Sequence, residues 1–293
     1  MHPYCRQILE FRPACNRVRN DGSNGARLVV TAAVRGFVRP TGEIVMVAVT
    51  IFRRVSALWS IAVLTLAIFQ VAGTTVVRAQ DYAALLAAPD RTEADRQNDK
   101  RREALKLLTF TGPKTGWLVL DMGALAGYST ELMARAVGPT GKVWGQNDKI
   151  VEKFETRLKT PAMINAVSQI RSYDDPATGL PPLDLITFFF NYHDTTYMDV
   201  DRGKMNKALF AALKPGGFLV IADHSARPED GANVGKTYHR IAETTVRSEV
   251  EAAGFKFVAD ADFLRNPDDP RTAIVFRSPI KVDEFVLKFQ KPM

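Results

Sequence analysis

The chain has 293 residues, of which 46% are hydrophobic and 24% charged, and this balance excludes wholesale disorder, a fibrous repeat and a polytopic membrane protein. The net charge of +7 comes entirely from residues 1–79, which hold ten arginines and three acids, because residues 80–293 carry equal numbers of basic and acidic side chains. A neutral body lacks the basic surface that nucleic acids require, so we expect a small-molecule substrate and no nucleic-acid partner.

The leader begins with residues 1–45, an arginine-rich segment that we interpret as a disordered extension or as a start codon assigned too early. A start at Met46 would give a leader of ordinary length. Both cysteines, Cys5 and Cys15, lie in this first segment. The rest of the chain therefore has no thiolate for a zinc site and no cysteine nucleophile.

Residues 46–79 have the pattern of a signal peptide or membrane anchor. Arg53-Arg54 precede an uncharged apolar run, and Val77-Arg78-Ala79 follows it with the residues of a cleavage site. We expect either cleavage after Ala79 or retention as a transmembrane helix, since the run is long enough to span a bilayer. Both outcomes place the body outside the cytoplasm, in the periplasm or beyond it, with membrane contact only through this segment.

The predicted elements that follow have the chain order of an α/β fold. Residues 80–115 form a helical extension, with a linker over 80–91 and a charged helix over Thr92–Leu108. Apolar runs then alternate with helix-forming segments, which indicates a mainly parallel sheet with helices on both faces. The predicted strands are Trp117–Asp121, Lys142–Asn147, Val167–Tyr173, Leu183–Phe190, Phe218–Ala222, Phe255–Phe263 and Thr272–Phe276, and the predicted helices are Ser129–Val137, Ile150–Leu158, Arg202–Leu213 and Thr237–Ala253.

The last two predicted strands have no helix between them, so we expect them to pair as an antiparallel hairpin at one edge. The predicted fold is therefore α/β, a Rossmann-like, seven-stranded, mostly parallel sheet with that edge hairpin. It occupies residues 116–280 and leaves residues 281–293 as a C-terminal tail.

A turn rich in small residues joins the first strand to the first helix of this domain. Such a turn lets backbone approach a ligand closely, and the helix that follows offers free N–H groups. Polar residues also end the next three strands, at the edge where open α/β sheets bind ligands. The candidate cofactor-binding residues are Asp121, Gly123, Ala124 and Gly127 in the turn, and Gln146, Asn147, Asp148, Asp174 and Asn191 at the strand ends.

With these motifs, residues 117–276 resemble a class I S-adenosylmethionine-dependent methyltransferase, and within that superfamily a group of exported bacterial methyltransferase-like proteins. The resemblance implies S-adenosyl-L-methionine as cofactor, and it implies that Asp99 and Arg102 reach the substrate side. Two positions depart from the family pattern, because Leu125 replaces the middle glycine of the turn and Asn147 replaces the acid that ends the second strand. The matching stretches are Val119–Gly123, Ala136–Pro139, Gly145–Asn147, Asn191–Asp194, Leu213–Gly217 and Ala222–Ala226.

Three histidines are the candidate catalytic residues, and all fall at strand ends or at the start of the last long predicted helix. His193 is the first choice for a general base that accepts a proton from the methyl acceptor, with His224 and His239 as alternates. Each could instead anchor a loop by hydrogen bonding. We expect His239 and Glu243 to share one helical face, four residues apart.

The sequence also contains ligand types for a divalent ion at this edge, but no dense motif such as His-Glu-x-x-His, and we expect no metal. The candidate ligands weighed were His193, Asp194, Asp223, His224, His239 and Glu243. The function that these observations favour is methyl transfer from S-adenosylmethionine to a small molecule by an exported transferase. The alternative is a non-catalytic exported ligand-binding protein on the same scaffold.

Overall fold

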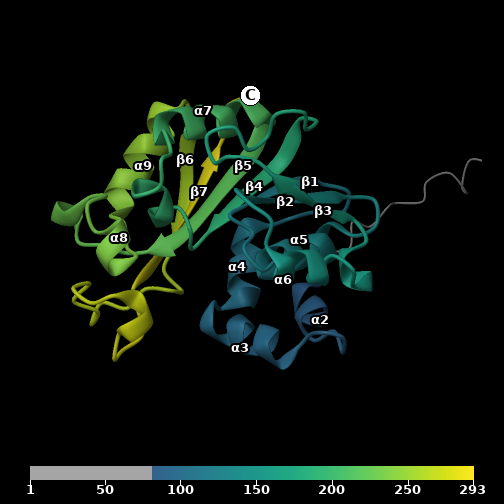
Figure 1. The fold of residues 1–293 in the computed structure, drawn as a ribbon, viewed down its shortest axis with the longest axis horizontal. Helices are drawn as coiled ribbons and strands as arrows, with labels where there is room; N and C mark the ends of the chain where they lie inside the picture. Colours follow the sequence, from purple (N-terminus) through teal and green to yellow (C-terminus); the bar gives the residue numbers. More distant parts are fainter. Residues whose placement is uncertain (1–80) are drawn as a thin grey trace, which may run out of the picture. The chain divides into compact units, whose positions relative to one another are not determined.

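The computed structural model describes residues 81–293, and the leader with its signal or anchor lies outside them. Its centre is a seven-stranded sheet of order β3-β2-β1-β4-β5-β7-β6, in which β1 to β5 run parallel and β7 is antiparallel to both neighbours (Figure 1). This confirms the predicted fold class. The strands are β1 (Leu118–Met122), β2 (Lys142–Asn147), β3 (Ala166–Ile170), β4 (Leu183–Phe189), β5 (Leu213–His224), β6 (Lys256–Ala261) and β7 (Glu284–Gln290).

Helices cover both faces of the sheet, because alternate residues of the central strands point to opposite sides. Val119 of β1 packs with α4, α5 and α6 in one apolar core. Leu120, its neighbour in sequence, packs with α7 and α9 in the other. None of the helices in residues 81–293 is long and apolar enough to cross a membrane. The helices are α2 (Tyr82–Leu86), α3 (Glu93–Arg101), α4 (Ala104–Thr111), α5 (Tyr128–Val137), α6 (Glu152–Arg157), α7 (Arg202–Ala212), α8 (Gly235–Tyr238) and α9 (Glu243–Ala252).

The N-terminal extension differs from its prediction in two places. The expected linker over 80–91 contains α2, and the expected single helix over Thr92–Leu108 is two helices. The break comes at Glu103, whose backbone takes a left-handed conformation with φ 46°. This turn separates the polar α3 from α4, whose Leu107 and Leu108 are buried in the core.

The last strand of the sheet is where the sequence prediction was wrong. Thr272–Phe276 forms no strand and runs instead into the short 3₁₀ helix η4 (Val275–Arg277). The seventh strand is β7, within the segment expected to be a C-terminal tail. It pairs antiparallel with β6, so the antiparallel pair expected at one edge of the sheet is confirmed, with β7 lying between β5 and β6. Its Phe285, Leu287 and Phe289 enter one core, so the domain extends through the predicted tail.

The helix predicted over Thr237–Ala253 is also interrupted. Its first part is α8, its second is α9, and His239 between them has a left-handed backbone with φ 54°. The break turns Arg240 into the interior, where its Nη1 donates to Asp269 at 2.8 Å and to the carbonyl of Ser225 at 2.9 Å. His239 and Glu243 therefore do not share a helical face, and Glu243 pairs instead with Arg265.

Candidate active site

Asp121 organises the turn after β1 from inside the protein. It is fully buried, and its carboxylate accepts hydrogen bonds from the hydroxyls of Ser129 at 2.8 Å, Thr130 at 2.6 Å and Thr187 at 2.7 Å. Burial raises the pKa of Asp121, and these three donors act against that rise. The structure thus places this sequence-predicted residue behind the turn, where it ties β1 to α5 and β4.

The two glycines of the turn are required by packing around it. Gly123 has φ 59°, and a Cβ there would lie 2.2 Å from Oδ1 of Asn191. Gly127 has φ 83°, and a Cβ there would lie 2.5 Å from the ring of Phe154 on α6. Ala124 is buried beside them. Gly123 therefore lets the turn lie directly against the residue that follows β4.

The two departures from the family pattern contact each other. Asn147 Oδ1 accepts from the backbone N–H of Leu125 at 2.8 Å, and Asn147 Nδ2 donates to the carbonyl of Leu125 at 3.3 Å. Leu125 has φ 50° and is 51% exposed, so the amide holds a left-handed residue where the family has glycine. Gln146 also points inward, because it accepts from the N–H of Gly123 and donates to the carbonyl of Arg171. Asp148 is the exposed polar residue at the end of β2.

Two neighbouring residues after β3, Tyr173 and Asp174, contact different parts of the protein. Asp174 pairs with Lys204 of α7 at 2.9 Å, and the hydroxyl of Ser172 together with Lys204 lowers its pKa. Tyr173, which sequence reasoning did not single out, is buried and donates to Oδ1 of Asn191 at 2.5 Å. Asn191 in turn donates to Oδ2 of Asp194 at 2.5 Å. The structure therefore joins Asn191 to the turn and to the histidines, and turns Asp174 toward α7.

His193 is the centre of a polar cluster at the ends of β4 and β5. It is 3% exposed, and its Nδ1 lies 2.7 Å from Oδ1 of Asp223, whose Oδ2 accepts from the His193 backbone N–H. Its Nε2 faces Asp194 Oδ1 at 3.1 Å and His239 Nδ1 at 3.3 Å. Burial lowers the pKa of His193, but Asp223 and Asp194 outweigh that effect and raise it to about 10.

His239 belongs to this cluster and His224 lies beside it. The left-handed turn at His239 brings its Nδ1 to 3.4 Å from Asp194 Oδ1, and Tyr197 donates its hydroxyl to the same oxygen. The His224 ring is 5.5 Å from that of His193, and its Nδ1 is 2.9 Å from Glu284 at the start of β7. The sequence-predicted histidines thus share one edge of the sheet. Of the three, His193 and His239 have ring nitrogens within hydrogen-bonding distance of each other.

A partly apolar cavity of about 240 Å³ opens beside His224. Figure 1 shows α3, α4 and the long loop after β6 on the side of the sheet where β4 and β5 end, and this cavity lies between the end of α3 and that loop. It can take a small organic molecule next to the histidines. Its lining residues are Arg101, His224, Val275, Phe276, Ile280, Lys281, Val282 and Glu284.

Arg102 enters the same edge of the sheet from the N-terminal extension. Its guanidinium stacks on the rings of Tyr128 and Phe190, with centroid distances of 5.1 and 4.5 Å. Burial lowers its pKa to about 10, and its Nε has no hydrogen-bond partner among the described residues. Asp99 binds Arg91 and the hydroxyl of Tyr128. The Arg102 guanidinium is therefore a partly buried cation beside Phe190, close to the end of β4.

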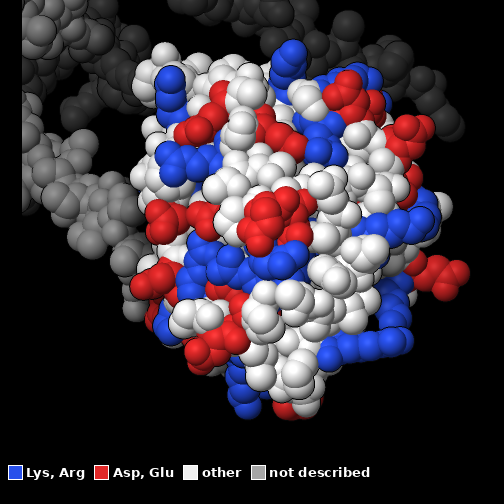
Figure 2. Space-filling model, turned by 90° about the vertical axis from the view of Figure 1, so that its left-hand side faces the viewer, with Lys and Arg blue, Asp and Glu red and all other residues white. Residues whose placement is uncertain are grey.

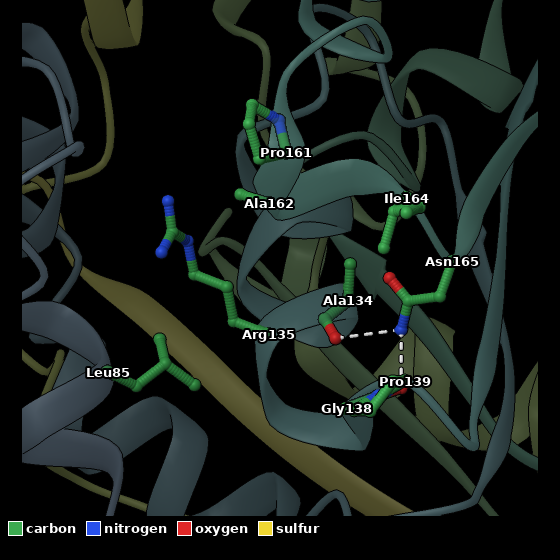
Figure 3. A pocket seen from close by; sticks show the side chains of 9 residues that line it. All are labelled: Leu85, Ala134, Arg135, Gly138, Pro139, Pro161, Ala162, Ile164 and Asn165. Atoms are coloured by element: carbon green, nitrogen blue, oxygen red, sulfur yellow. Dashed lines mark hydrogen bonds between the residues drawn. The ribbon is translucent and has the colours of Figure 1, made fainter.

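Another cavity, of about 360 Å³, lies at the far end of α5 and holds none of the predicted site residues. Figure 3 shows its lining, with Asn165 donating to the carbonyls of Ala134 and Gly138. The loop after α5 leads into the start of β2, so this cavity is at the opposite edge from the histidines. Ligands of open α/β sheets bind at the carboxyl ends of the strands, which favours the histidine edge as the active site.

Comparison with known proteins agrees with the fold. No family model matches the chain. The ubiquinone/menaquinone biosynthesis C-methyltransferase UbiE of Salmonella arizonae is 26% identical over 176 residues, which cover 57% of this chain and 67% of that protein. An S-adenosylmethionine-dependent methyltransferase from Aquifex aeolicus is 20% identical and covers 64% of this chain and 88% of its own, with a TM-score of 0.49. The cyclase SpnF is 13% identical and covers 66% of this chain and 82% of its own, with a TM-score of 0.52.

The sheet order is that of a class I methyltransferase fold. UbiE of Cronobacter sakazakii, 25% identical over 160 residues, is likewise named a ubiquinone/menaquinone biosynthesis C-methyltransferase, and the match covers 61% of its length.

Proposed function

We propose that the described domain transfers a methyl group from S-adenosylmethionine to a small-molecule acceptor. The observation that carries this proposal is the contact chain from the glycine turn to the histidines. Gly123 packs against Asn191, and Asn191 donates to Asp194, which faces His193 and His239. A donor seated on the turn and an acceptor beside the histidines would lie next to each other, as in-line displacement requires.

The residues at the turn fit this cofactor. Asp148 is exposed at the end of β2 and can accept hydrogen bonds from ribose hydroxyls. Arg102 supplies a partly buried cation whose buried Nε has no hydrogen-bond partner among the described residues, which suits the carboxylate of the amino-acid moiety. The turn itself leads into the N-terminus of α5 at Tyr128. When bound, the cofactor supplies an electrophilic methyl group, and the protein's own residues position it and exclude water.

On the acceptor side, the proposal assigns two tasks to side chains near the histidines. Asp223 orients His193, while Asp194 and His239 are the more open groups that hold or accept the acceptor's proton. The cavity beside His224 is lined in part by Val275, Phe276 and Ile280, so it favours a largely apolar acceptor. An acceptor of this kind is consistent with relatives named for ubiquinone and menaquinone biosynthesis.

The charge of the surface supports a small molecule over nucleic acid. Figure 2 shows basic and acidic side chains interspersed over the face that it presents, without a continuous basic area. Nucleic-acid binding depends on such an area. The neutral net charge of residues 80–293 agrees with this view.

The test of cofactor binding is calorimetric titration of the full chain with S-adenosylmethionine and S-adenosylhomocysteine. We expect saturable binding of both, and Asp148→Asn should weaken it about tenfold or more by removing a charged hydrogen-bond acceptor. Asp174→Asn is the matched control, since Asp174 follows the next strand, β3, but is paired with Lys204. The cofactor affinity of this variant should stay near that of the wild type. Absence of heat and of a thermal shift at millimolar cofactor would instead favour the non-catalytic scaffold.

We also propose that the domain is exported, on the sequence of the leader alone. Arg53-Arg54 and the uncharged run before Ala79 support translocation with cleavage or anchoring. Fractionation of cells and N-terminal sequencing of the product test this. A cytoplasmic product that keeps residues 1–79 contradicts it, and such a result leaves the methyltransferase proposal intact.

A further inference from the structure

Three ligand-type atoms at the end of β4 converge on one point. His193 Nε2, Asp194 Oδ1 and His239 Nδ1 are separated by 3.1, 3.3 and 3.4 Å, taken pairwise, and so form a nearly equilateral triangle. An ion with metal–ligand distances of about 2.1 Å separates its ligand atoms by roughly 3.0 Å in octahedral and 3.4 Å in tetrahedral geometry. The observed edges fall within that interval.

We propose that these three atoms form a binding site for a divalent first-row transition-metal ion. Two imidazoles and one carboxylate suit zinc, iron, manganese or cobalt, whereas magnesium and calcium prefer all-oxygen ligand sets. The sequence offers these three residues among six candidate ligands, but no motif selects them, because Asp194 and His239 are far apart in the chain. The left-handed turn at His239, which no sequence pattern indicated, brings them together.

The neighbours of the triangle hold its members in the orientation that a metal site needs. Asp223 lies 2.7 Å from Nδ1 of His193, which leaves Nε2 as the ligand atom in the carboxylate–histidine–metal arrangement common in proteins. Asn191 fixes the other oxygen of Asp194 at 2.5 Å, and Tyr197 donates to the ligand oxygen itself. The backbone conformation at His239 directs its ring inward.

One side of the triangle is open. His193 is buried, but the side chains of Asp194 and His239 keep 21% and 25% of their surface exposed. An ion bound here would have three protein ligands and free positions for an exogenous oxygen or nitrogen, as catalytic metal sites do. The competing occupant of the triangle is a single proton on His193 Nε2, shared with the two facing atoms. The experiment must separate these two occupants.

The experiment uses the full chain with Cys5→Ser, Cys15→Ser and His2→Gln, so that those leader side chains donate no ligand. The protein is freed of metal with a chelator and titrated with Co²⁺ by visible absorption, then with Zn²⁺ in competition with a chromophoric chelator. We expect one equivalent of ion with a Co²⁺ spectrum of nitrogen and oxygen ligation. His239→Ala should weaken binding at least 100-fold, and Asp194→Asn at least tenfold.

Two variants keep the result interpretable. His224→Ala removes a histidine from the same edge but not from the triangle, and it should bind within about threefold of the parent. His239→Gln retains a polar side chain at the turn, and it should also lose the ion while keeping the parent's circular dichroism and melting temperature. The proposal is overturned if the parent binds none of Zn²⁺, Co²⁺ or Mn²⁺ below 100 μM, which assigns the triangle to a proton. It is also overturned if His239→Ala and His239→Gln bind as the parent does. No cofactor is present, so the outcome is independent of methyl transfer.

Discussion

Asn147 is the residue on which the atypical cofactor turn depends. Its amide makes two hydrogen bonds to the backbone of Leu125, at 2.8 and 3.3 Å, and it is 2% exposed. Each such bond contributes about 0.5–1.5 kcal/mol, so Asn147→Ala should lower the free energy of unfolding by about 1–3 kcal/mol. For a domain of this size, the melting temperature should fall by about 2–12 °C.

The effect should depend on what occupies position 125. Leucine in a left-handed conformation is strained by about 1–2 kcal/mol, whereas glycine adopts it at little steric cost. In a Leu125→Gly background the turn needs less support, so Asn147→Ala should cost about 1 kcal/mol less than in the wild type. Leu125→Gly alone should keep or tighten binding of S-adenosylmethionine, and Asn147→Ala alone should weaken it.

Urea denaturation of the four proteins in this cycle gives the stabilities, and calorimetry gives the affinities. Asn165→Ala is the matched control, because the Asn165 amide also makes two hydrogen bonds to the backbone, donating to carbonyls at 3.0 and 2.7 Å, but at the far end of α5. It should lower stability by a similar amount and leave cofactor affinity unchanged. The reasoning is refuted if the effects at positions 125 and 147 add without coupling, or if Asn147→Ala is as stable as the wild type.

Three further changes test the site. Gly127→Val should lower the melting temperature by well over 5 °C or prevent folding, because the valine side chain would collide with Phe154. A variant that melts like the wild type would contradict this packing. Arg102→Met keeps a long side chain against Tyr128 and Phe190 but removes the charge. The protein should be as stable or more stable, while the Kd for S-adenosylmethionine should rise about 10–100-fold. Scanning calorimetry measures the stability, and titration calorimetry measures the Kd. Once an acceptor is known, His239→Ala should lower turnover by about 10²–10⁴-fold with cofactor affinity unchanged, because His239 is proposed to accept the acceptor's proton, whereas the raised pKa of His193 keeps that ring protonated at neutral pH. Retention of full turnover by this variant would show that His239 is structural.

The parallel part of the fold was predictable because its strands are short apolar runs separated by amphipathic helices. β7 was missed because Glu284 and Lys288 interrupt its apolar pattern, and its charges are accommodated only in the folded protein. Lys288 Nζ, for example, donates to the carbonyls of Phe110 and Thr111 at the end of α4. Such a partner, nearly 180 residues away, leaves no local signal in the sequence.

The site was predictable as an edge of the sheet but not as an arrangement of atoms. Strand ends indicated that His193 and His224 would lie near the cofactor turn, because parallel strands end together. The inward direction of Gln146 and Asn147 depends on the backbone of the turn, and the position of His239 depends on a break inside a segment with continuous helical periodicity. Tertiary hydrogen bonds, not local propensity, decide both.

Asn191 connects the two halves of the proposed reaction. Its Oδ1 accepts from buried Tyr173 and lies where a side chain at Gly123 would be, while its Nδ2 donates to Asp194. If the turn shifts when the cofactor binds, it would therefore displace the Asn191 amide. Both the oxygen and the nitrogen of this amide are held by hydrogen bonds. Because the interior is close-packed, such a displacement passes to its bonded partner rather than being absorbed. Seating of the donor and orientation of Asp194 toward the acceptor should thus be coupled through this one side chain.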